Sequence, residues 1–176
     1  MDSLKEGVCM KQNVENRWVV IYTIILGAAY IILGAVEFAL GIYNLSSPME
    51  NASFIGVPAD IFGGLATLVI GATYLSAMPL LKGLRESLGF ILVGTLLSTV
   101  FGVIYLLIVC ADGLGTLLAS LEGEEWTWEW LTSGTAGPGL LRPEIWLFFA
   151  SLPLGIYVLK TTRKEKFPDV ATIKSV

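Results

Sequence analysis

The sequence predicts an all-α integral membrane protein, a bundle of four helices that cross the bilayer. Of its 176 residues, 55% are hydrophobic and only 15% are charged, which is too apolar for a soluble domain of this size. Four long apolar runs recur along the chain, and most of them reach the roughly 20 residues that a membrane-spanning helix needs. The Lys and Arg residues fall between these runs in a pattern that also predicts the topology.

The four spans are expected at residues 18–43, 59–81, 88–111 and 144–160, and the fourth is the shortest. Together they form one membrane domain, 18–160, with tails at 1–17 and 161–176. The N-terminal segment does not resemble a cleavable signal peptide, because acidic residues lie where a basic region is required and the first apolar run is too long. We therefore expect it to remain as the first membrane helix.

All but one of the eleven Lys and Arg residues lie in three segments: before the first run, between the second and third, and after the fourth. Cytoplasmic loops are enriched in Lys and Arg, so both termini and the short middle loop are predicted to be cytoplasmic. Segments 44–58 and 112–143 are then on the far side of a plasma membrane or endomembrane. Only Arg142 lies elsewhere, near the end of the longer far-side segment.

The absence of His excludes several chemistries. Haem, catalytic zinc and Ser-His or Cys-His nucleophiles all draw on imidazole, so no cofactor or metal and no enzymatic activity is expected. A nucleic-acid partner is not indicated either. Cys9, shortly before the first span, is a candidate for S-palmitoylation, or else an unmodified thiol. Asn51 starts an N-x-Ser triplet in the far-side segment 44–58 and is a candidate glycosylation site.

Small residues mark the faces along which the helices are expected to pack. Glycines seven residues apart form one stripe along a helix, and such stripes let two backbones approach closely in lipid. The third span has the small-xxx-small pattern of Gly94, Ser98 and Gly102. The predicted packing glycines are Gly27, Gly34, Gly41, Gly63, Gly64, Gly71, Gly94 and Gly102.

Glu37 is the carboxylate that lies well inside a span, beside the glycine stripe, so it should face other helices and not lipid. Side chains at a similar depth, and therefore its expected hydrogen-bond partners, are Tyr105, Thr67 and Ser151. With no Lys or Arg expected at that depth, the carboxyl should be mostly neutral at pH 7. It is either a proton or cation site, or a protonated carboxyl that donates a hydrogen bond and sets helix register. Asp60 and Asp112, at span ends, are expected to be solvated at the membrane interface.

The far-side segment 112–143 is predicted to contain an amphipathic helix that lies on the membrane. Leucines at helical spacing precede an acidic stretch in which Trp126, Trp128 and Trp130 alternate with polar residues. Indole suits the headgroup region, where its apolar ring and its N–H donor both find partners. The segment is either an interfacial anchor or a recognition surface for a partner outside the cell.

The first two spans resemble the membrane-spanning four-domain family A, which includes the B-lymphocyte antigen and the beta subunit of the high-affinity IgE receptor. The likeness is carried by residues 26–28, Gly34 and 39–41 in the first span, and by residues 62–64 and 71–72 in the second. The longer far-side segment has no cysteine, whereas members of that family often have a disulfide there. The resemblance implies a non-enzymatic protein that associates with itself or with receptors.

The sequence is compatible with three functions. The preferred one is an accessory or regulatory membrane protein of receptor signalling or trafficking, which acts by lateral association as a homo-oligomer or in a complex with other membrane proteins. The alternative is an oligomeric cation channel or channel regulator with Glu37 in the pore. The third, a membrane enzyme that uses Glu37, Asp60 or Asp112, has the weakest support because no paired-acid motif is present. The sequence does not identify a partner or ligand.

Overall fold

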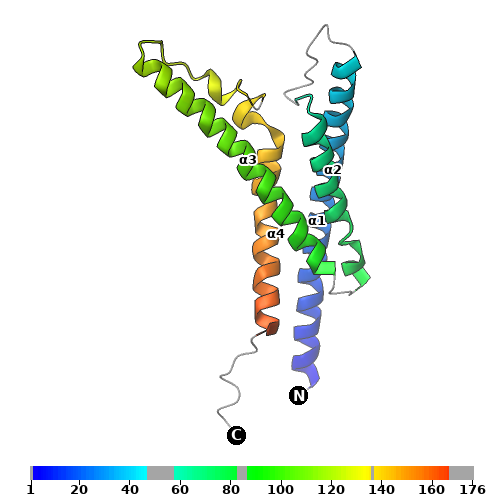
Figure 1. Cartoon of the computed structure of the whole chain (residues 1–176). Helices are drawn as coiled ribbons and strands as arrows, with labels where there is room; N and C mark the ends of the chain where they lie inside the picture. The colour runs from blue at the N-terminus through cyan, green and yellow to red at the C-terminus, as the bar shows by residue number, and fades with distance from the viewer. Residues whose placement is uncertain (1, 47–57, 83–86, 136, 167–176) are drawn as a thin grey trace.

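The computed structural model describes residues 2–46, 58–82, 87–135 and 137–166, with side chains from Arg17 onward in the first range and up to Arg163 in the last (Figure 1). Most of this part of the chain is helical. The four long helices are α1 (Asp2–Ser46), α2 (Ile61–Leu75), α3 (Leu88–Leu121) and α4 (Pro143–Lys166). Short 3-10 helices are η1 (Met78–Lys82), η3 (Glu129–Leu131) and η4 (Gly139–Leu141).

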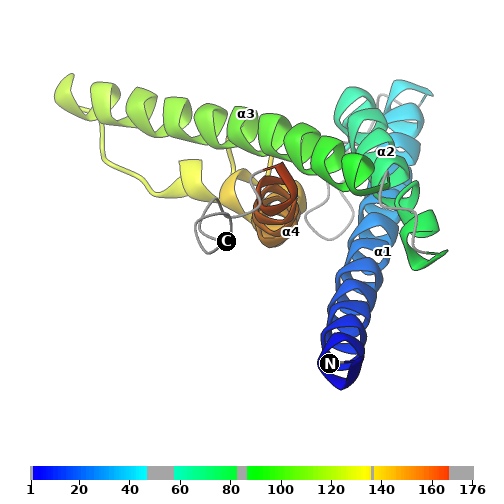
Figure 2. The same cartoon turned by 90° about the horizontal axis from the view of Figure 1, so that it is seen from below.

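Within the described residues, four segments are long and apolar enough to cross a membrane, which confirms the four-span prediction. They are Arg17–Ser46, Ile61–Leu81, Leu88–Leu121 and Pro143–Arg163. The helices form two antiparallel pairs: α1 packs mainly on α2, and α3 packs mainly on α4. We call the end where α1 and α3 finish and where α2 and α4 begin the loop end of the bundle. Figure 2 shows that α3 is strongly tilted and that its last turns extend well beyond α1 and α2.

Glycine makes the close contact between α1 and α2 possible. A Cβ atom on Gly34 would lie 2.7 Å from the carbonyl oxygen of Gly64 and 2.7 Å from the backbone nitrogen of Leu68. Gly27 and Gly41 face α2 in the same way. Each of the eight glycines predicted to pack lies against another part of the same chain, and Gly102 and Gly94 accommodate the side chains of Phe148 and Tyr74. The glycine faces are therefore covered within one molecule.

A layer of buried hydroxyl groups crosses the middle of the bundle. The hydroxyls of Tyr30 and Ser98 are 2.6 Å apart, and those of Ser98 and Ser151 are 3.1 Å apart. Tyr74 donates to Thr95 at 3.2 Å, and its ring stacks on that of Tyr30 with centroids 5.9 Å apart. These hydrogen bonds satisfy polar groups that would be costly in hydrocarbon, and they connect α1, α2, α3 and α4.

The segment after α3 differs from the prediction. The leucines from 114 to 121 do not form a separate interfacial helix but continue α3 for ten residues beyond Ala111. Asp112 does not end the helix, because its carboxylate accepts hydrogen bonds from the backbone N–H and the hydroxyl of Thr135, at 2.8 and 2.6 Å. The helix ends only before Gly123, whose φ of 104° suits glycine. Residues 122–131 then contain no α-helix, only η3.

Candidate functional site

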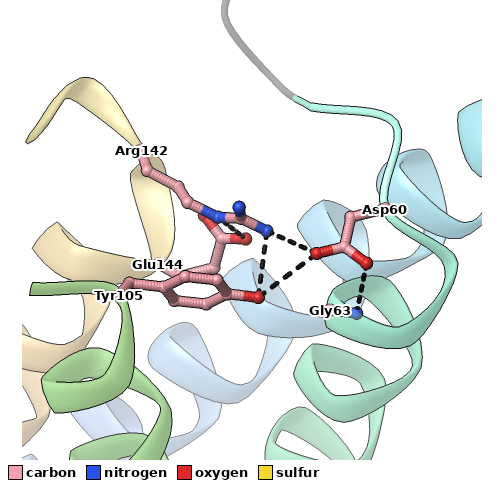
Figure 3. A network of polar contacts seen from close by, with 5 residues as sticks. All are labelled: Asp60, Gly63, Tyr105, Arg142 and Glu144. Atoms are coloured by element: carbon pink, nitrogen blue, oxygen red, sulfur yellow. Dashed lines mark hydrogen bonds and ion pairs between the residues drawn. The ribbon is translucent and has the colours of Figure 1, made fainter. Parts of the chain in front are cut away.

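A network of charged side chains connects three helices at the loop end of the bundle, and its anchor on α2 is Asp60 (Figure 3). Asp60 caps the N-terminus of α2: its Oδ1 accepts a hydrogen bond of 2.8 Å from the backbone N–H of Gly63. Its Oδ2 accepts from Nη2 of Arg142 at 2.9 Å and from the hydroxyl of Tyr105 at 3.4 Å. The same carboxylate thus holds the start of α2 and a residue that precedes α4.

Arg142 is the centre of the network. Its side chain is 3% exposed, and its Nε donates to Oε1 of Glu144 at 2.9 Å. Nη2 also donates to the Tyr105 hydroxyl at 3.0 Å, and Cζ lies 3.7 Å from the centroid of that ring, which is a cation–π distance. The planar guanidinium satisfies several acceptors at once, a geometry that a Lys ammonium would not reproduce.

This geometry explains the pKa shifts of Asp60 and Arg142, the two charged groups of the network that lie outside the spans. Burial opposes ionisation of Asp60, but the Gly63 N–H and the Arg142 guanidinium outweigh it and hold the pKa of Asp60 below its usual value. Burial also acts to lower the pKa of Arg142, whereas Glu144 and the other partners raise it above its usual value. Both groups are therefore charged at neutral pH.

An acid titration should report the contribution of Asp60. Because its pKa is lower in the folded than in the unfolded protein, ionised Asp60 stabilises the fold above the unfolded value of about 3.9. The contribution decreases as the pH falls below that value and is lost once the pH is below the folded pKa. The difference in unfolding free energy between wild type and Asp60→Asn should therefore be constant near neutral pH and disappear in acid. Thermal unfolding in detergent over a pH series measures it, and a difference that persisted at the lowest pH would contradict the assignment.

Glu37 of α1 lies next to this network, and none of the donors in the network contacts its carboxyl oxygens. The side chain is 0% exposed, and neither carboxyl oxygen has a hydrogen-bond partner. Oε2 of Glu144, which is 4% exposed, is also without a partner. Glu37 nevertheless interacts electrostatically with Glu144 first, and then with Arg142 and Asp60. One guanidinium already faces two carboxylates, so the local charge is negative before Glu37 is counted.

The residues expected around Glu37 are placed differently from the prediction. Ser151 donates to the carbonyl of Phe148 at 2.7 Å and belongs to the hydroxyl layer. By helix rise it lies roughly 10 Å further along α4 than Glu144. Thr67 is buried on α2 but is not bonded to the Glu37 carboxyl. Tyr105 belongs to the site through its bonds to Arg142 and Asp60, and not through a bond to Glu37.

Sequence reasoning missed Arg142 and Glu144, and it expected no basic side chain at this depth. The segment after α3 returns along that helix, and Figure 1 shows it leading back to the start of α4 beside the other helices. Arg142 is thereby brought into the interior. A signal was present, because Arg142 is the one basic residue outside the three predicted cytoplasmic segments and stands two residues before an acid. Asp60, expected to be an interfacial carboxylate, is a member of the network.

The three tryptophans lie apart from this site, along the returning segment. Trp126 and Trp128 have centroids 5.5 Å apart, and Trp128 and Trp130 are stacked at 6.4 Å. Trp128 is 64% exposed, whereas Trp130 covers Gly113 of α3. Asn51 lies outside the described residues, as does the side chain of Cys9.

These features define the class of protein: a four-span integral membrane protein with a polar site inside the bundle. Residues 12–161 match the family model of the MJ0565 integral membrane domain, and the chain belongs to this family. It is 27% identical over 117 residues to the uncharacterized protein MJ0565 of Methanocaldococcus jannaschii, an alignment that covers 65% of this chain and 77% of the relative. No solved structure matches the chain. The resemblance to the membrane-spanning four-domain family A stays a prediction, because nothing in these matches connects the chain to that family.

Proposed function

We propose that the protein is a non-enzymatic membrane protein that binds and releases a cation at an acidic site inside its own helix bundle. The site consists of Glu37 and Glu144, with Arg142 and Asp60 as fixed neighbours. The observation that carries the proposal is the Glu37 carboxyl, which is completely buried in a span and has no hydrogen-bond partner on either oxygen. The protein would act as a cation-linked transporter or as a regulator of cation movement.

The energetics favour a functional explanation for Glu37. An ionisable group inside a membrane helix is costly, and a purely structural one is expected to be paired or hydrogen-bonded. Arg142 does not provide that partner: its Nε and Nη2 bond Glu144 and Asp60, and neither oxygen of Glu37 accepts a bond from it. Glu37 therefore adds a third carboxyl to a site that is already negative, and a bound positive ion would balance it.

Among the described side chains of the site, Asp60 is the one that is partly exposed. The side chain of Asp60 is 32% exposed, whereas those of Arg142, Glu144 and Glu37 are buried. Asp60 lies at the loop end of the bundle and is joined to Glu144 through Arg142, so a cation would enter from this end. Because Glu37 is buried within its own chain, the proposed site lies within one subunit and not in a pore between subunits.

Flux into liposomes that contain the purified full chain tests the proposal. We expect acidification or alkali-cation uptake above that of empty liposomes, and loss of most of this flux in Glu37→Gln, which preserves the shape of the side chain but not its charge. Glu129→Gln is the matched control, because Glu129 is exposed in the returning segment and far from Asp60 in the sequence. Equal flux in wild type and Glu37→Gln, with both proteins folded, would overturn the proposal.

Lateral association, as an accessory of receptor signalling or trafficking, is the second candidate. The glycine stripes do not support association between chains, because they are covered within one chain. It is favoured by the last turns of α3, which extend beyond α1 and α2 and carry exposed Leu114, Leu118 and Leu121 (Figure 2). Cys110, also exposed on α3, offers a chemical test, because copies that meet through this part of α3 would crosslink there.

A further inference from the structure

We infer that Glu37 and Glu144 share a single proton, so that the cation bound at this site is H⁺ and not a metal ion. The inference rests on the function proposed above and names its ligand. Three carboxyl oxygens carry it: both oxygens of Glu37 and Oε2 of Glu144 are buried and without a hydrogen-bond partner, although the two carboxyls interact. A proton shared between the two carboxyls turns one oxygen of Glu37 into a donor and gives Oε2 of Glu144 a donor to accept from.

Two neighbouring carboxyls rarely ionise together, because like charges at short distance repel strongly where little water screens them. Here the two members are not equivalent. Oε1 of Glu144 already accepts a charge-assisted bond from Arg142. Glu37 has no such donor. The geometry therefore assigns the proton to Glu37, with its O–H directed toward Oε2 of Glu144.

A metal ion does not fit the same place. Alkali and alkaline-earth ions require several oxygen ligands around one position, whereas a proton requires only two acceptors. The guanidinium of Arg142 already occupies the position between Asp60 and Glu144 and would repel a second cation. On the α2 side the backbone is close, since a Cβ on Gly64 would lie 3.0 Å from the Cβ of Glu37. Among the described residues, no group of three or more acidic or cysteine side chains could hold a metal ion.

The charged and titratable groups that face Glu37 come from each neighbouring element. They are Asp60 at the start of α2, Tyr105 on α3, and Arg142 and Glu144 at the start of α4. Uptake moves one proton from water at the loop end onto a Glu37 carboxylate oxygen, forming one O–H bond and neutralising one negative charge. Release breaks that bond and returns the proton to water, so no further reactant is needed.

Infrared spectroscopy of the full chain in liposomes tests the inference directly, because a protonated carboxyl has a C=O stretch that a carboxylate lacks. At neutral pH we expect one such band per chain, shifted in D₂O. Glu37→Gln should abolish it, and Glu144→Gln should shift or abolish it, because the acceptor of the shared proton changes. Glu129→Gln is the control and should leave the band unchanged.

The wild-type protein gives a second measurement that needs no variant. At constant pH, adding Na⁺, K⁺ or Ca²⁺ to the wild-type protein should leave the intensity of the band unchanged. Loss of the band on adding one of these ions would overturn the inference. A band that Glu144→Gln leaves unchanged would overturn it as well. Failure of the inference and failure of the proposed function remain distinguishable. A shared-proton band in a protein without cation flux overturns only the proposed function, whereas Na⁺ or K⁺ flux without the band overturns only the inference.

Discussion

Replacing Arg142 with Met should destabilise the folded protein by about 3–5 kcal/mol, the cost of breaking a buried ion pair by removing one partner. The side chain is 3% exposed, and its loss leaves Oε1 of Glu144, a residue whose side chain is 4% exposed, without its donor. Asp60, which is partly exposed, would be solvated more easily. Thermal or denaturant unfolding in a mild detergent measures the loss.

Two comparisons show whether the pairing itself is responsible. Adding Glu144→Gln to Arg142→Met removes the uncompensated carboxylate, so the double variant should recover part of the stability lost by the single one. Arg163→Met, on the exposed last turns of α4, should have an effect within experimental error. If the loss of Arg142 were no more costly than that of Arg163, the network would not be an element of the fold.

Gly34→Leu is the second change with a large expected effect, because it inserts a side chain where two backbones touch. Even its Cβ would lie 2.7 Å from backbone atoms of Gly64 and Leu68, and neither can move without displacing α2. Overpacking of this kind costs roughly 1–3 kcal/mol, and rigid backbone neighbours favour the upper end of that range. The same replacement at Ile32, which is 67% exposed, should cost little.

The same variant separates packing within the chain from association between chains. In a Cys9→Ser background, oxidative crosslinking through Cys110 reports contacts between copies. Gly34→Leu should lower the unfolding temperature and leave the crosslinked fraction unchanged, because the stripe contacts α2 of its own chain. A variant that kept full stability but lost crosslinking would mean instead that the stripe is an interface between molecules.

Local chemistry explains why the spans and the packing glycines could be predicted. A helix in lipid satisfies its own backbone hydrogen bonds, so apolar length alone indicates where it lies. Glycine spacing identifies a helix face in the same local way. Glu37 could be recognised for a similar reason, since one acid in an apolar run is visible without knowledge of its neighbours. The end of α3 was misplaced because Asp112 looks like a boundary until its hydrogen bonds to Thr135 are known.

Only the tertiary structure decided which residues surround Glu37. Arg142 is 82 residues from Asp60 and 37 from Tyr105, and these separations have no periodicity that a sequence pattern could reveal. Their meeting depends on the path of the segment after α3 and on how the two helix pairs dock. The sequence by itself therefore determined the number of spans, the glycine faces and the presence of an acid inside the membrane. Only the packing of the helices decided that this acid lies beside a second carboxyl and a buried arginine, because such contacts depend on where distant segments come together in space.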